Sequence, residues 1–514
     1  MKNIIYLLVI TVVLITSCSE DFLELSPGYA ITSGNYFKTE AHFNEALNGT
    51  YAKLRGALND DHSWLHGEMR SDNTHFTYGT NQPLAVINKE LSEQFLDRSD
   101  FGDVYNKYAE LYSVISSANL IIGKIDAVGL EASVTDPIIG QAKFIRALCY
   151  FELVRYFGGV PIYDEAVEDP DNAFIARSSV ENVYEFIKSD AKEAVDKLPK
   201  PTFPQKGYAS KSSARMLLGY VYITLKNYNE ALTQFQEITN YGHNLLPNYA
   251  SVFELENKNS RESIFELQYS KEIDKGQHNS TPYLFLPFTY DLSMIVGISP
   301  SVNIWDSGWN VPTWEMINSY EPGDERLDAS IAIAEGTGTV PKFVIEAIKS
   351  PVGYSTPADK ISYPYIKKLI HAHNVLKQTD DNFIIYRYAE VLLFIAESFN
   401  ELNKPDEALA YINQVRNRAG LENITETSQS ALRDIIVHER RIELAFENKR
   451  YQDLVRTGKA VEIMNANGVY IKNFFRQGGY LLQNGYDVTE EKLILPIPER
   501  ETRIAGLKQN PGYY

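Results

Sequence analysis

The sequence KSSARMLLGYVYITLKNYNEALTQFQEITNY, residues 211–241, decides the fold. Its apolar residues recur at helical spacing on both sides of Lys226-Asn227, which predicts two helices joined by a tight turn. Gly219 in the first helix and Ala231 in the second are small enough to let the helices approach closely. The segment therefore predicts an antiparallel helical hairpin.

The same arrangement of residue types returns at 383–418, with a turn at Asn403-Lys404-Pro405. Both segments have the offsets of a tetratricopeptide repeat. The matching positions are Leu218, Gly219, Tyr222, Tyr228, Ala231 and Phe235, and then Ile395, Ala396, Phe399, Ala408 and Ile412. We therefore expect a mainly α fold, built as a tetratricopeptide-like helical hairpin scaffold at 36–242 and 381–514.

Residues 243–380, between the two hairpins, differ in composition from the scaffold. They are rich in Pro, Gly, Asn, Ser and aromatic residues and show little helical period, apart from strand-like pieces such as SIFELQYS at 263–270. This pattern predicts a large loop-rich insertion. Loops on a rigid scaffold often carry binding sites.

Two further helices have clear boundary signals. The first is expected to start with Asp136 as N-cap and Pro137 at the first helical position, and to end at Gly158-Gly159. The second is expected to start at Ser178, with Glu181 completing a capping box, and to end before Pro199.

The first residues have the layout of an export signal. Lys2 is followed by an apolar run from Ile4 to Ile15, which is shorter than the roughly 20 residues needed to span a bilayer. The small residues before Cys18 look like a bacterial lipoprotein box, in which cleavage precedes the cysteine and its sulfur is acylated. We expect a signal peptide at 1–17 and a lipidated N-terminus and tether at 18–35. The alternative is an ordinary signal peptide with a chance cysteine.

The overall charge narrows the classes of partner. The chain of 514 residues has a formal net charge of −18 at pH 7. Such a field repels nucleic acid and anionic lipid, which argues against a nucleic-acid or membrane-surface role. If Cys18 is acylated, Cys149 is the other cysteine and no internal disulfide can form.

All four Trp residues lie in two polar, turn-rich windows, 60–78 and 303–316. A sugar presents an apolar C–H face, which aromatic rings can cover, and hydroxyls, which carboxylate, amide or guanidinium groups can bind. The candidate ligand-binding residues in these windows are Trp64, Arg70, Asp72, Asn73, Tyr78, Trp305, Asp306, Trp309 and Asn310. The alternative is that a loop Trp covers an edge of the core.

A run of charges near the C-terminus is interpreted as structural. It comprises Glu439, Arg440, Arg441, Glu443, Glu447, Lys449 and Arg450. Glu443 and Glu447 are a like-charged i,i+4 pair and need cations from elsewhere, for which Arg387 and Arg416 are candidates. We expect a network that ties helices together.

Signals for catalysis or metal binding are weak. His62 and His66 have i,i+4 spacing and Glu68 follows, but this is no HExxH motif and no third ligand is evident. His371 and His373 are expected at a loop or strand end. We predict no catalytic residue, no metal and no cofactor; a structural Ca²⁺ stays open, although no loop concentrates its oxygen ligands.

The chain resembles the SusD/RagB family of outer-membrane lipoproteins of Bacteroidetes-type bacteria. The resemblance lies in Cys18 with EDFLELSP after it, RALCYFELVRYFGGVPIY at 146–163, VPTWEMINSYEPGDERLDASI at 311–331, and the block from YRYAEVLLFIAESFNEL at 386 to QNPGY at 509–513. It covers essentially all of the chain after Cys18 and implies a single large SusD-like binding domain at 36–514. Asp72-Asn73 matches a recurrent Asp-Asn of the family, and the PTWEM context of Trp314 matches a scaffold motif.

The resemblance implies a place and a role. The place is the outer membrane, lipid-anchored through Cys18 and facing the cell exterior. The role is to capture a glycan without chemistry and deliver it to a partner TonB-dependent barrel of the SusC type. Oligopeptide capture, as in RagB, is the alternative, and a glycan-degrading enzyme or a purely structural surface protein is less favoured.

Overall fold

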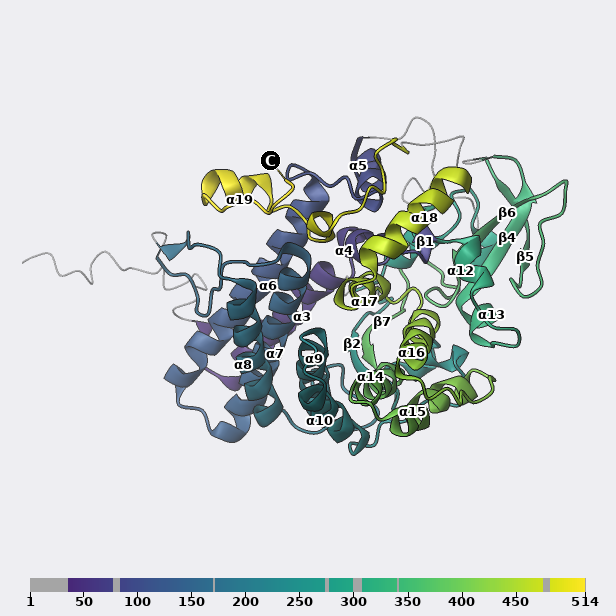
Figure 1. The fold of residues 1–514 in the computed structure, drawn as a ribbon. Helices are drawn as coiled ribbons and strands as arrows, with labels where there is room; N and C mark the ends of the chain where they lie inside the picture. The colour runs from purple at the N-terminus through teal and green to yellow at the C-terminus, as the bar shows by residue number, and fades with distance from the viewer. Residues whose placement is uncertain are drawn as a thin grey trace, which may run out of the picture.

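The structure is a computed structural model that describes residues 36–76, 84–169, 172–272, 277–298, 307–339, 342–474 and 481–513. Helices dominate its architecture (Figure 1). The main scaffold helices are α3 (Glu40–Leu58), α6 (Gly102–Ile125), α7 (Ala132–Phe157), α8 (Val180–Lys197), α9 (Lys211–Thr224), α10 (Tyr228–Thr239), α14 (Tyr388–Glu401), α15 (Pro405–Arg418) and α16 (Gln429–Glu443). Shorter or peripheral helices are α4 (Asp61–Gly67), α5 (Leu84–Glu93), α11 (Ser293–Val296), α12 (Trp314–Asn318), α13 (Arg326–Ser330), α17 (Arg450–Arg456), α18 (Ala460–Phe474) and α19 (Glu499–Ile504).

The predicted hairpin is present as α9 and α10. Lys226 adopts a φ of 60° in the turn between them. A Cβ on Gly219 would lie 2.6 Å from a ring carbon of Phe235, so glycine is needed for this close approach of the helices. Both the hairpin and the reason for its small residue are confirmed.

The second predicted hairpin is present as α14 and α15. Asn403 has a φ of 59° in the turn, and Pro405 is the first residue of α15. Although the two hairpins are far apart in sequence, α10 packs directly against α14. The helices from α6 to α10 and then α14 and α15 therefore form one continuous row (Figure 1).

The starts of two helices differ from the predictions, whereas their ends agree. α7 begins at Ala132, not after Asp136, because the Asp136 carboxylate binds Lys197 at 2.5 Å instead of capping the helix. α8 takes Ser179 as its N-cap, since Ser178 already donates its backbone N–H to Val160.

The region 243–380 contains short helices and strands. β2 (Ser263–Leu267), which the sequence predicted, pairs antiparallel with β7 (Phe383–Arg387) and so joins this region to the start of α14. The sequence did not predict the antiparallel sheet in which β4 (Ile331–Thr337) lies between β5 (Val344–Lys349) and β6 (Ile361–Ile366). The sheet lies at the opposite side of the molecule from α6 to α8 (Figure 1).

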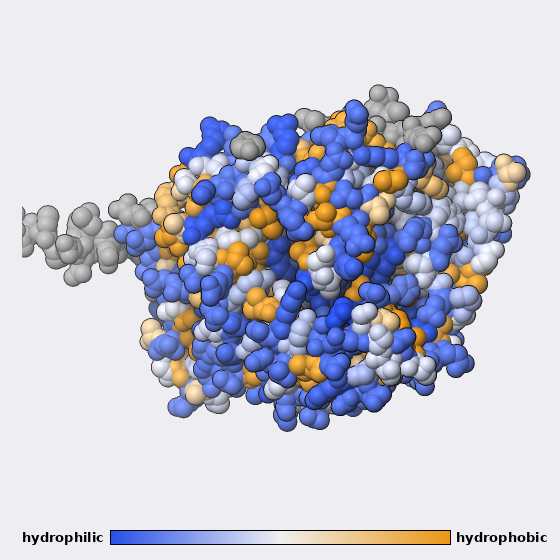
Figure 2. Space-filling view, in the orientation of Figure 1, coloured by the Kyte–Doolittle hydropathy of each residue, from blue (hydrophilic) through white to orange (hydrophobic). Residues whose placement is uncertain are grey.

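Most of the apolar side chains are in one core that runs through the helical row. The visible face of the molecule is mainly hydrophilic, with hydrophobic side chains in separate patches (Figure 2). In the part of the chain that the structure describes, α6 with its short extension to Val128 is the one helix long and apolar enough to cross a membrane. It packs against α3 and α7, as a core helix does.

Burial of His243 predicts a pH-dependent stability. Its side chain is 2% exposed and lies between the Arg261 carbonyl, at 3.0 Å, and the Ser212 hydroxyl, at 2.8 Å. Burial lowers the pKa of His243 to about 4, whereas an unfolded histidine titrates near about 6.5. Between these values the unfolded chain binds more protons, so the free energy of unfolding falls as the pH drops from about 6.5 to about 4.

We therefore expect His243→Gln to remove up to about 3 kcal/mol of the acid-induced loss of stability. Urea unfolding at a series of pH values measures this slope. His42→Gln, at a partly exposed histidine on α3, is the control and should keep the original slope. An unchanged slope in His243→Gln would contradict the assignment.

Candidate functional site

The two aromatic windows of the sequence meet in the structure. β1 (Thr74–His75) pairs antiparallel with β3 (Val311–Pro312), with Thr74 opposite Pro312. The Thr74 hydroxyl also donates to Asn310 Oδ1 at 2.7 Å. Two segments more than 200 residues apart in the sequence thus form one unit, called the β1–β3 frame below. The structure shows where each candidate ligand-binding residue lies relative to it.

Trp64 is a core residue. It is 1% exposed, and its ring contacts those of Phe285 and Phe383 at centroid distances of 4.6 and 5.1 Å. Its Nε1 donates to Asn59 Oδ1 at 2.9 Å. Because α4 turns this ring inward, almost none of its surface is exposed to a ligand.

Arg70 is buried as well. It pairs with the Asp97 carboxylate and donates to the Lys492 carbonyl at 2.8 Å. Its guanidinium lies 4.1 Å from the centroid of the Phe95 ring. These contacts hold the loop after α4 against the C-terminal part of the chain and leave the guanidinium no ligand-facing side.

Asp72 and Asn73 bind two arginines of the C-terminal charge run. Arg450 lies 2.7 Å and Arg441 3.1 Å from the Asp72 carboxylate, and Arg441 donates to Asn73 Oδ1 at 2.9 Å. Burial alone would raise the pKa of Asp72, but the two guanidinium groups outweigh it and hold the pKa at about 2. Asp72 is thus ionised, and its charge is balanced by Arg441 and Arg450 within the protein. Its role is to position these two arginines.

Trp309 and Asn310 are buried next to the β1–β3 frame. Trp309 is 5% exposed, stacks on Phe76 with a centroid distance of 5.7 Å, and has Lys89 Nζ 5.0 Å from its ring centroid. Asn310 is fully buried. Neither side chain offers an open face to a ligand.

Several calls fall outside the described residues. They are the candidate ligand contacts Tyr78, Trp305 and Asp306, the signal peptide at 1–17, and the tether at 18–35 with its lipidation site Cys18. They stay predictions.

A row of aromatic side chains, absent from the sequence-based candidates, lies beside this frame. Trp314 is partly exposed, and its ring is within 8° of parallel to that of Tyr354, with the centroids 6.4 Å apart. The Tyr470 hydroxyl lies near the backbone of Trp314 and Glu315 at the start of α12, and the Tyr470 ring stacks on Phe474 at 5.7 Å. Phe474 is 52% exposed. Phe474, Tyr470, Trp314 and Tyr354 are called the aromatic row below.

Helix α12 connects the aromatic row to the cluster of Asp72, Asn73 and Arg441, which is called the charged frame below. Thr313 caps this short helix by accepting from the Met316 N–H at 3.0 Å. Glu315, which follows Trp314 in this helix, binds Arg441 at 2.6 Å. Arg441 therefore connects Asp72 and Asn73 to the helix that presents Trp314.

The sequence offered partial signals for this row. Trp314 was assigned to the scaffold; it does pack against the core, but part of its side chain stays exposed. Tyr470 and Phe474 are four residues apart, which places them on one face of a helix. No sequence signal connected α18 with residues 314 and 354.

The C-terminal charge run is a buried network, as expected. Arg387 binds Glu447 at 2.7 Å and Glu443 at 2.5 Å, and Arg416 binds Glu439 at 3.0 Å. Arg387 is thus confirmed as a cation for Glu443 and Glu447, whereas Arg416 binds Glu439 and Glu321 instead, and Arg418, Arg326 and Lys368 complete the pairing. The network joins β7 and α15 to α16.

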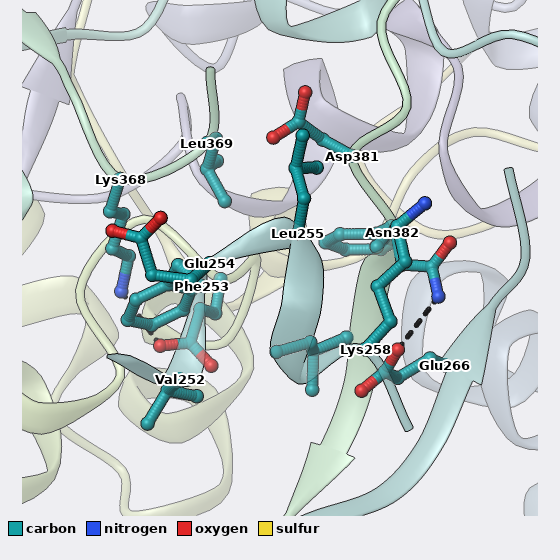
Figure 3. Close-up of a pocket in the computed structure, with 13 residues that line it drawn as sticks. Val252, Phe253, Glu254, Leu255, Lys258, Glu266, Lys368, Leu369, Asp381 and Asn382 are labelled. Carbon is teal, nitrogen blue, oxygen red and sulfur yellow. Dashed lines mark hydrogen bonds and ion pairs between the residues drawn. The ribbon is translucent and has the colours of Figure 1, made fainter. Parts of the chain in front are cut away.

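One edge of the network lines a small crevice between Phe253 and Leu369 (Figure 3). Two of its polar contacts are internal: Asn382 donates to Glu266 at 2.8 Å, and the buried Lys368 binds Glu447 at 2.7 Å. The crevice is therefore bounded by structural contacts.

The zinc set considered from the sequence is not assembled. His66 faces Asp97 at 3.5 Å, while Glu68 accepts the backbone N–H of Phe446 and of Asn448. These two side chains point away from a common centre with His62.

Comparisons with known proteins agree with this architecture. A family model described as "SusD family" matches residues 261–513, and one described as "Starch-binding associating with outer membrane" matches residues 21–223. A SusD-like protein of Formosa agariphila is 28% identical over 545 aligned residues, which cover 100% of both chains.

Solved structures are similar over nearly the whole chain. A laminarin-binding SusD-like protein is 25% identical with a TM-score of 0.72, covering 93% of this chain and 100% of its own. A SusD superfamily protein from Parabacteroides distasonis is 25% identical with a TM-score of 0.73, covering 94% of this chain and 100% of its own.

Proposed function

The chain belongs to the SusD family, and on that basis we propose that it captures a glycan at the cell surface and delivers it to a TonB-dependent outer-membrane barrel of the SusC type. The role is binding without chemistry. Support for the glycan comes from the laminarin-binding relative, and support for the location comes from the outer-membrane association in the family description.

The aromatic row is the observation that carries the proposal. Trp314 and Phe474 present partly exposed rings that can cover the C–H faces of sugar units. Glu315, half exposed beside Trp314, can accept hydrogen bonds from sugar hydroxyls. A row of rings suits a ligand of several linked sugars better than a single small molecule.

The charged frame supplies rigidity to this site. Asp72, Asn73 and Arg441 lie behind α12 and hold Glu315, so the rings need little reordering when a ligand binds. Trp305, Asp306 and Tyr78 are proposed as further ligand contacts from the adjoining loops.

A binding screen tests the proposal. The purified chain is applied to an array of oligosaccharides and polysaccharides and, in parallel, to a pool of peptides. Saturable binding to a glycan class supports the proposal. Binding to peptides alone would favour the RagB-like alternative, oligopeptide capture, over glycan capture. Hydrolysis products in the same samples would contradict binding without chemistry.

Cys18→Ala tests the proposed anchor. We expect the purified variant to bind its ligand with unchanged affinity, because the aromatic row is formed by residues 314–474. Cells that produce the variant should lose ligand capture, since the acyl chains that hold the protein at the membrane are absent. Surface capture of a fluorescent glycan measures this, and normal capture by the variant cells would contradict the anchor.

Delivery to a barrel has its own test. Co-purification of the protein with a large outer-membrane barrel in mild detergent supports this part of the proposal. Its absence under those conditions would leave glycan capture standing but contradict delivery.

A further inference from the structure

Three potential metal ligands converge where α3, α4 and α6 meet. They are Asp60, the N-cap of α4; His62, in its first turn; and Glu110, on α6. One ligand atom from each lies within 4.8 Å of the other two. Gly56 of α3 adjoins the site, and a Cβ there would lie 3.4 Å from Glu110 Oε2.

The histidine is buried, and one of its ring nitrogens lacks a partner. His62 is 1% exposed, and its Nε2 has no hydrogen bond to any of the described residues. This nitrogen is directed at Glu110 Oε2, 3.5 Å away, which is also buried and without a hydrogen bond to the described residues. A buried polar atom without a hydrogen bond costs free energy, and a cation bound between these two atoms would satisfy both.

The separation of the two atoms fits two ligands of one metal ion. Zn²⁺ bonds to histidine nitrogen and carboxylate oxygen are about 2.0–2.2 Å, which places neighbouring ligands of a tetrahedral site about 3.3–3.5 Å apart. Asp60 Oδ2 lies 4.0 Å from the other ring nitrogen of His62, and its side chain is 54% exposed and free to turn toward the ion.

The neighbouring charged groups show which carboxylates are available to bind a metal ion. Asp61 lies next to His62, but its other carboxylate oxygen binds Lys89 at 2.7 Å, and Lys89 also binds Asp103. Asp61 is thus already neutralised, whereas Glu110 Oε2 has no hydrogen bond to any of the described residues. Asp60, His62 and Glu110 remain as the three protein ligands.

We propose that Asp60, His62 and Glu110 bind one divalent transition-metal ion, with Zn²⁺ as the fitting case and water completing its coordination. The set of one imidazole and two carboxylates is a borderline-hard donor set that Zn²⁺ accepts. The ion fastens the start of α4 to α6. It is independent of the glycan proposal, since none of its ligands belongs to the aromatic row.

Calorimetric titration of the metal-free purified chain with Zn²⁺ tests the site. We expect one saturable ion per chain and a rise in the melting temperature with Zn²⁺, because an ion that binds the folded state stabilises it. Titration with Co²⁺ should give visible absorption bands of a low-symmetry nitrogen and oxygen site.

Glu110→Gln and His62→Gln should each weaken Zn²⁺ binding by about 10-fold or more. Glu110 is partly exposed, so its variant is expected to fold normally even if His62→Gln does not. His371→Gln is the matched control: His371 also lies between two carboxylates, Asp381 and Glu254, but is outside the proposed site. Unchanged Zn²⁺ binding in Glu110→Gln, loss of binding in His371→Gln, or no saturable binding in the unmodified chain would overturn the proposal.

Discussion

Arg387→Met is expected to lower the free energy of unfolding by about 3–5 kcal/mol, because it removes one member of a buried ion network and leaves its partners insufficiently compensated. Arg387 is 1% exposed and binds Glu443, Glu447 and Glu262. Methionine fills much of the same volume, so the loss reports the charge rather than a cavity. Urea unfolding monitored by Trp fluorescence measures the change.

The remaining cations set the size of this effect. Glu443 also binds Arg326 and Arg418, and Glu447 binds Lys368. Addition of Glu447→Gln to Arg387→Met should recover part of the loss, since it removes one of the carboxylates left with too little positive charge.

Arg503→Ala is the control for this series. Arg503 and Glu499 form an exposed pair on α19, and such pairs contribute little to stability. We expect a change within about 0.5 kcal/mol. A loss below 1 kcal/mol in Arg387→Met, comparable to this control, would contradict a dependence of the fold on the buried network.

Trp314→Ala is expected to weaken binding of the glycan identified in the screen by about 10–100-fold, the loss typical of an aromatic residue at the centre of a binding site. The Trp314 ring is partly exposed and parallel to Tyr354. Truncation removes the apolar face on which a sugar ring would lie. Calorimetry with the purified chain measures the affinity, and circular dichroism verifies the fold.

Phe174→Ala is the matched control for an exposed aromatic residue elsewhere. Phe174 is 59% exposed and lines a pocket together with residues of α6. Helix α6 lies left of centre in Figure 1, and α12 lies at the right. We expect its affinity to match that of the unmodified chain. Equal affinities in Trp314→Ala and Phe174→Ala would move the binding site away from the aromatic row.

The helical scaffold could be predicted because its signals are local. Gly219 and the turn at Lys226 lie within one hairpin, and their spacing alone fixes how the two helices meet. Arg387 could also be anticipated as a cation for Glu443 and Glu447, since a like-charged pair on one helix needs opposite charges from its neighbours.

The exposure of the candidate ligand-binding residues could not be predicted in the same way. Trp64 and Trp309 lie in polar, turn-rich sequence, yet the contacts that bury them come from Phe285, Phe383 and Phe76. Exposure is set by such long-range packing, which composition does not reveal.

The placement of α12 shows why a scaffold assignment is compatible with a partly exposed side chain. Trp314 lies in a motif that signals scaffold, and α12 is indeed held in place by Arg441 through Glu315. The same fixation directs part of the tryptophan outward. A residue can thus belong to the scaffold and still offer a surface, which its sequence context alone does not show.

The contacts of Arg441 have a consequence for engineering this chain. The guanidinium of Arg441 binds Asp72, Asn73 and Glu315. The rings of the aromatic row take no part in these polar contacts. Replacement of Trp314, Tyr354 or Phe474 would therefore change the proposed recognition surface while leaving the ion pairs of Arg441 in place. If the aromatic row binds the ligand, these positions are where specificity can be redesigned, whereas changes at residues 72, 73 or 441 would displace α12 as a whole.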